Sequence, residues 1–77
     1  LTYYNRGIAK NKIGDYLGAI SDYSKAIEID PNYTNAYINR GNIKEAQLSD
    51  RKGACSDWIK ASNLGDGNSA KWVKEDC

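Results

Sequence analysis

The sequence predicts an all-α fold of stacked helix hairpins, because the chain repeats itself and each copy carries two helical patterns separated by breakers. Five residues recur at a spacing of 34 and seven more at a spacing of 35. The first set is Tyr3, Asn5, Arg6, Gly7 and Lys10, which recur as Tyr37, Asn39, Arg40, Gly41 and Lys44. The second set is Asp15, Gly18, Ala19, Ser21, Asp22, Lys25 and Ala26, which recur as Asp50, Gly53, Ala54, Ser56, Asp57, Lys60 and Ala61. Self-similarity at a fixed period is typical of a duplicated structural unit.

The first copy predicts two helices on either side of Gly14. Apolar residues return every three or four positions from Tyr16 to Ile29, which is the spacing of one helix face. Asp15 is placed to cap this second helix by accepting from the free N–H groups of its first turn. Pro31 lacks a backbone N–H and disfavours helical geometry at Asp30, so the helix is expected to end there.

The second copy predicts the same hairpin with a longer turn. A new helix is expected near Thr34, and Asp50 is placed to cap the helix that follows it. The one extra residue of this copy falls in or beside the turn at 48–53, where an insertion costs least. Residues 67–77 are then expected to form a short final helix that covers the end of the stack.

Glycines and aromatics recur together in the predicted hairpins. Gly7 and Gly41 lie inside helices, where each costs about 1 kcal/mol relative to alanine. A glycine kept twice at that cost indicates close contact between helices. Tyr23 and Trp58 occupy matching positions on the apolar faces, and we expect both in the core.

Composition disfavours several functional classes. Eleven basic and ten acidic residues give a net charge of +1, unlike the basic surface typical of nucleic-acid binders. No apolar run approaches the roughly 20 residues that span a bilayer, so no membrane partner is expected. The chain does not begin with Met and Leu1 falls within a helical pattern, so we expect a fragment or a processed form. The compartment is left open.

Catalytic and metal-binding patterns are weak, so neither an enzyme nor a cofactor is expected. The sequence has no histidine, and two cysteines are too few for a zinc site. Asp22 with Lys25, and Asp57 with Lys60, are predicted to be weak surface pairs along one helix. The turn at 65–68 has no adjoining strand and does not indicate a phosphate loop.

Two cysteines leave two interpretations open. Cys55 stands near the start of the fourth helix on its apolar face, and Cys77 ends the helix expected beside it. A disulfide between them would stabilise a small chain and would indicate an oxidising compartment. The alternative is two unrelated thiols, with Cys55 acting as a small apolar core group.

The pattern resembles the tetratricopeptide repeat, a 34-residue helix-turn-helix. The matching residues of the first copy are Tyr3, Gly7, Ala19, Tyr23, Ala26 and Pro31. The chain departs from the family at Arg6 and Arg40, where an apolar residue is usual, and at Lys10 and Lys44, where an aromatic is usual. The resemblance implies a right-handed α-solenoid of about five helices. It divides residues 1–77, as one domain, into repeat one (1–33), repeat two (34–66) and a capping helix (67–77).

The resemblance also implies a protein–protein interaction scaffold that holds a peptide or a partner helix in a concave groove lined by the first helix of each repeat. The residues that it turns toward the groove are Tyr4, Asn5, Ile8, Asn11, Lys12, Ile38, Asn39, Asn42 and Glu45, with Val73 and Lys74 on the capping helix. Some family members bind a peptide's terminal carboxylate with a clamp of Lys, Arg and Asn. Tyr4 and Ile8 stand where that clamp needs Lys and Asn, so it is not expected here. The alternative is that these residues form merely solvated helix faces.

The sequence is compatible with two other functions. One is a structural module whose exposed first helix stacks on another copy, making a homo-oligomer or a longer solenoid. The other is RNA binding, as the 35-residue spacing and the repeated asparagines would allow. The near-zero net charge disfavours RNA, so a protein or peptide partner is predicted.

Overall fold

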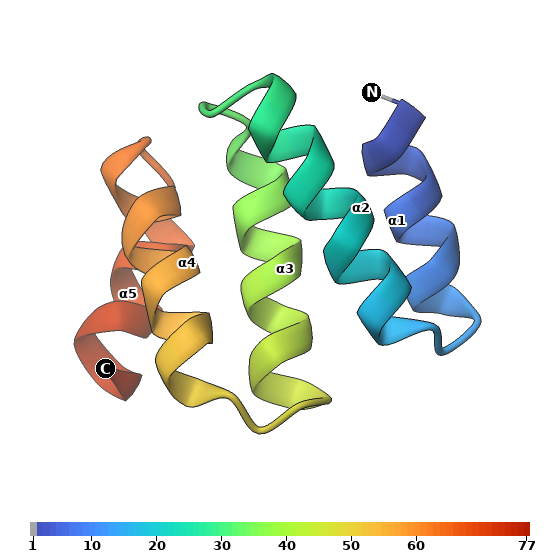
Figure 1. Ribbon diagram of the computed structural model, residues 1–77. Helices are drawn as coiled ribbons and strands as arrows, with labels where there is room; N and C mark the ends of the chain where they lie inside the picture. The colour runs from blue at the N-terminus through green and yellow to red at the C-terminus, as the bar shows by residue number, and fades with distance from the viewer. Residues whose placement is uncertain (1) are drawn as a thin grey trace.

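The computed structural model describes residues 2–77, so the expectation that Leu1 lies in a helix falls outside the described residues. Over this range the chain forms five helices and no strand. They are α1 (Thr2–Lys12), α2 (Tyr16–Ile29), α3 (Thr34–Ala46), α4 (Arg51–Asn63) and α5 (Gly67–Asp76). Each helix packs mainly against the next one in the chain, as Figure 1 shows. This arrangement confirms the predicted all-α class of stacked hairpins.

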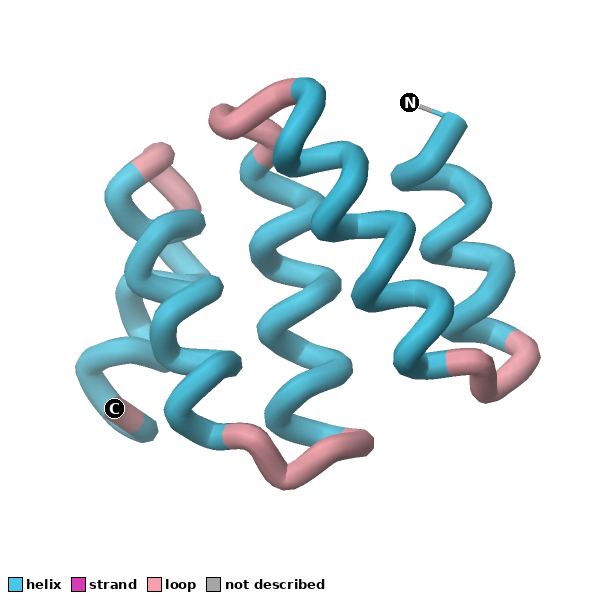
Figure 2. Tube along the Cα trace, in the orientation of Figure 1, coloured by secondary structure: helices cyan, strands magenta, loops and turns pink. Residues whose placement is uncertain are grey.

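The chain reverses direction at each connection between helices, and aspartate side chains cap three of the helix starts. The loops α1–α2 and α3–α4 lie at one edge of the stack, and α2–α3 and α4–α5 at the other (Figure 2). The predicted caps are confirmed: Asp15 accepts from the backbone N–H of Gly18 at 3.1 Å, and Asp50 from that of Gly53 at 2.9 Å. A third cap, not predicted, is Asp66, which accepts from the N–H of Ser69 at 2.8 Å.

The apolar faces of α2, α3 and α4 supply the buried apolar residues of the core. Its buried residues are Ala19, Tyr23, Ala26, Ala36, Tyr37, Ile43, Ala54, Trp58 and Ala61. Small alanines allow neighbouring helices to approach, and the second helix of each hairpin contributes one large aromatic, Tyr23 or Trp58. This confirms the expected burial of Tyr23 and Trp58.

Gly7 and Gly41 lie where these aromatics press on the first helix of each hairpin. A Cβ on Gly7 would lie 2.8 Å from Cε1 of Tyr23, and a Cβ on Gly41 would lie 2.9 Å from Nε1 of Trp58. Both distances are shorter than van der Waals contact. The predicted close approach is therefore confirmed in both hairpins.

Replacing Gly7 with leucine is expected to destabilise the fold by about 1–3 kcal/mol, because the new side chain must displace the buried ring of Tyr23. Ala9→Leu is the matched control, since Ala9 is exposed on the same helix. Urea unfolding followed by circular dichroism measures both changes. Equal stability of the two variants would mean that the glycine is incidental.

Candidate functional site

A polar depression of about 210 Å³ lies between α1 and α3. Its lining residues are Asn11, Asn39, Asn42, Ile43, Ala46 and Gln47. Three of these, all asparagines, are among the predicted groove residues. The depression therefore gathers side-chain amides, which both donate and accept hydrogen bonds.

Asn39 is held in place by a contact between the two hairpins. Its Nδ2 donates to the hydroxyl of Tyr4 at 2.9 Å. The ring of Tyr4 in turn packs against Tyr33, with centroids 4.7 Å apart, and against Tyr23 at 5.6 Å. Within residues 2–77 no hydrogen bond engages Oδ1 of Asn39. The amide is thus fixed through its nitrogen and keeps an acceptor available.

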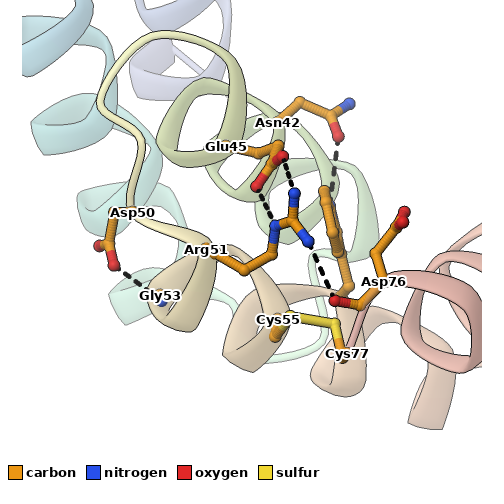
Figure 3. The surroundings of a disulfide bond; sticks show 9 residues. Asn42, Glu45, Asp50, Arg51, Gly53, Cys55, Asp76 and Cys77 are labelled. Carbon is orange, nitrogen blue, oxygen red and sulfur yellow. Dashed lines mark hydrogen bonds and ion pairs between the residues drawn. A yellow bond between two sulfur atoms is a disulfide. The ribbon is translucent and has the colours of Figure 1, made fainter.

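Asn42, one helical turn further along α3, is fixed through its oxygen. Its Oδ1 accepts from the indole Nε1–H of Trp58 at 3.2 Å, a contact drawn in Figure 3. An indole nitrogen only donates, so the amide oxygen must face it and the NH₂ group stays available. Asn39 and Asn42 therefore offer an acceptor and a donor from successive turns of one helix.

Glu45 lies one turn beyond Asn42 and is paired rather than free. Both of its carboxylate oxygens accept from Arg51, at 2.6 Å and 2.7 Å. Nη1 of Arg51 also donates to the backbone carbonyl of Asp76 at 3.2 Å, so this arginine contacts α3 and α5 together (Figure 3). The hydrogen bonds from Arg51 hold the pKa of the Glu45 carboxyl below its ordinary value. The negative charge of the Glu45 carboxylate is therefore balanced by Arg51.

The other predicted groove residues differ in exposure. Asn5 and Lys12 are exposed, and neither lines the asparagine depression. Ile8 packs against the core, and Ile38 is half-buried. The apolar surface expected from Ile8 is thus partly used inside the fold. On α5, Val73 is half-buried and Lys74 is exposed.

The prediction that Asp22 forms a surface pair with Lys25 is wrong. The Asp22 side chain is only 4% exposed, and it accepts from Nε and Nη2 of Arg6 at 2.9 Å and 2.8 Å and pairs with Lys10 at 3.2 Å. Lys25 pairs with Glu28 instead. The prediction considered only neighbours on one helix, whereas Asp22 faces α1 across the hairpin. The hydrogen bonds from Arg6 hold the pKa of Asp22 below its ordinary value.

The prediction of a surface pair between Asp57 and Lys60 fails for the same reason. Asp57 is buried and accepts from Arg40 at 2.9 Å and 2.6 Å, while Lys44 lies at 3.3 Å. Arg40 also donates from Nη1 to Ser24 at 3.0 Å, which links the two hairpins. The basic residues that depart from the family pattern therefore neutralise a buried aspartate in each hairpin. Arg6, Lys10 and Asp22 recur in the second copy as Arg40, Lys44 and Asp57. This joint recurrence is the signal that could have revealed the two Arg–Lys–Asp triads.

Cys55 and Cys77 form a disulfide in the structure, with Cα atoms 6.0 Å apart. It joins α4 to the end of α5 (Figure 3). Cys55 is half-buried rather than buried, because the bond lies at the surface where α5 ends. Between residues 2 and 77, no three His, Cys, Asp or Glu side chains gather as metal ligands, and no helix has the length and apolar character to cross a membrane.

The helix hairpins agree with a match between residues 1–33 and a model of the tetratricopeptide repeat. Residues 1–33 are a tetratricopeptide repeat. A tetratricopeptide repeat protein 36 homolog from Nematostella vectensis is 32% identical over 62 residues, covering 80% of this chain and 34% of that protein. A protein SGT1 homolog from Oryza sativa subsp. japonica is 44% identical over 39 residues, covering 51% of this chain and 11% of that protein.

These comparisons support the function that tetratricopeptide repeats have in common. Tetratricopeptide repeats generally mediate protein–protein interactions and are not themselves catalytic units. The chain spans about a third or less of the curated relatives that it matches.

Proposed function

We propose that this tetratricopeptide repeat chain is a scaffold that binds an extended peptide segment of a partner protein along the groove lined by α1, α3 and α5. The observation that carries the proposal is the pair of fixed amides on α3: Asn39 keeps an acceptor and Asn42 keeps a donor, one turn apart. An extended peptide has unpaired backbone N–H and C=O groups that match such a pair. A partner helix satisfies those groups internally, so the extended form is favoured.

Affinity is expected to be modest. Ile43 and Ala46 line the depression with the fixed amides, and Tyr4 is bonded to Asn39. A few apolar groups of this kind usually carry most of the energy of an interface. Two hairpins and one capping helix make a short groove. We therefore expect a dissociation constant no better than about 1 μM for this chain alone.

Replacing Asn39 with alanine is expected to weaken peptide binding by about 1 kcal/mol or more, roughly fivefold, because it removes the acceptor and releases Tyr4. The probe is a peptide selected from a random displayed library against the folded chain, titrated by calorimetry. Lys60→Ala, on the exposed side of α4, is the control and should change the binding free energy by less than about 0.5 kcal/mol.

If Lys60→Ala weakened peptide binding more than Asn39→Ala, the binding face would be on the second helices, α2 and α4. A selected peptide that binds as a helix, detected by a gain in helicity at saturation, would retain the groove but overturn the extended form.

A second candidate function is end-to-end stacking with another copy. It is favoured by one comparison between the hairpins: the guanidinium side chain of Arg40 is 18% exposed and reaches Ser24 of the preceding hairpin, whereas that of Arg6 is 55% exposed. The matching face of α1 is therefore open to a further helix. Light scattering over a concentration series tests this function, since stacking makes the average mass rise with concentration.

A further inference from the structure

Arg51 connects three helices near the C-terminal end of α3. It is the first residue of α4. Its guanidinium donates two hydrogen bonds to the carboxylate of Glu45 on α3 and one to the backbone carbonyl of Asp76 at the end of α5. The Arg51 and Glu45 side chains are 56% and 31% exposed. An exposed ion pair holds two long side chains in one geometry only weakly. The third contact, to Asp76, is therefore important for keeping the Arg51–Glu45 pair ordered.

The position of Asp76 depends in turn on the disulfide. Cys77, the next residue, is bonded to Cys55, and α5 packs mainly on α4. Cys77 itself is tied to α5 by a capping hydrogen bond, from its N–H to the carbonyl of Val73 at 3.1 Å. A helix end that few contacts hold opens easily. Without the disulfide, the carbonyl that holds Arg51 would lie on a fraying helix end.

We propose that Arg51 is a positioning residue that couples the redox state of the Cys55–Cys77 disulfide to the charge of the groove at Glu45. In the disulfide form, Arg51 is held by Asp76 and neutralises Glu45. In the dithiol form, the end of α5 frays, Arg51 loses that contact, and Glu45 becomes an unpaired anion. The reduced groove then offers a carboxylate to a lysine or arginine of a bound peptide. This regulation rests on the proposed function of the groove.

Reduction requires a reductant that can reach the bond, and the structure leaves room for one. A cavity of about 460 Å³ lies beside the disulfide, and Cys77 is exposed. The reductant is a dithiol: one of its thiolates attacks a sulfur of the protein disulfide, and its second thiolate resolves the mixed disulfide. The protein gains two electrons and two protons as two thiols, and the reductant becomes a disulfide.

Nuclear magnetic resonance of the free protein tests the coupling through the Nε–H groups of its arginines. Arg6 donates from Nε to Asp22 and its side chain is 55% exposed, which matches the 56% of Arg51, but it lies far along the chain from the disulfide. On addition of a dithiol, hydrogen exchange at Arg51 Nε–H should accelerate about tenfold or more, and that at Arg6 by less than about twofold. Equal protection of Arg51 before and after reduction would overturn the proposal. Loss of both signals together would also overturn it, since that would indicate global unfolding.

Two variants separate coupling from general loosening. In the wild type, the Glu45 carboxyl carbon signal should shift on reduction. Arg51→Lys keeps the charge but removes the forked contact, so in this variant the Glu45 signal should no longer respond to reduction. The double variant Cys55→Ser with Cys77→Ser should resemble the reduced wild type and be insensitive to the dithiol. A reduction response that persists in Arg51→Lys would show that Arg51 is not the connection. Because no peptide is present, the coupling and the proposed peptide binding can fail separately.

Discussion

Replacing Asp57 with alanine is expected to destabilise the protein by about 3–5 kcal/mol, which is the typical cost of removing one partner from a buried ion pair. The substitution leaves Arg40, whose side chain is only 18% exposed, and Lys44, at 21%, as two cations with no anion between them. Arg40 also bonds to Ser24, so the loss should reach the contact between hairpins. Urea unfolding followed by circular dichroism gives the free energy of unfolding.

Glu28→Ala provides the control for this substitution. Glu28 pairs with Lys25 on the surface of α2, where side chains are 71% and 47% exposed, and its removal should cost less than about 0.5 kcal/mol. A stability loss for Asp57→Ala as small as that of the control would mean that the triad is a surface feature after all.

Replacing Cys55 and Cys77 together with serine is expected to destabilise the protein by about 3 kcal/mol, because a closed loop of 22 residues restricts the unfolded chain. The same denaturation experiment measures it, with untreated and reduced wild type alongside. The untreated protein should be two hydrogens lighter than the reduced protein by intact mass. Alkylation of both thiols in folded, never-reduced protein would contradict the pairing and the stability difference with it.

The fold was predictable because its signals are local and repeated. Residues such as Gly7 and Gly41, the caps Asp15 and Asp50, and the breaker Pro31 each act within one or two turns of helix. Their recurrence at a near-constant spacing marks the hairpins independently of any single propensity. The structure confirms the helix class, the caps and the close contacts at both glycines.

The contacts that organise the candidate site were not predictable from one helix at a time. The bond from Asn39 to Tyr4 spans 35 residues, and the bond from Arg51 to Asp76 spans 25. The sequence pattern places Asp22 at the surface because its same-helix neighbour Lys25 is a plausible partner, whereas its actual partners come from another helix. Sequence patterns indicate which face of a helix is apolar, but not which polar side chains meet across a hairpin.

The most direct test of the groove is chemical-shift mapping of the side-chain amides of Asn39 and Asn42 during titration with the selected peptide. The proposed function predicts that their side-chain NH₂ signals shift with the peptide and saturate together with backbone signals of α1 and α3. The outer sides of α2 and α4, reported by the backbone amides of Lys25 and Lys60, should stay unchanged. Saturating shifts at Lys25 and Lys60, with Asn39 and Asn42 unmoved, would contradict the assignment of the groove as the binding face.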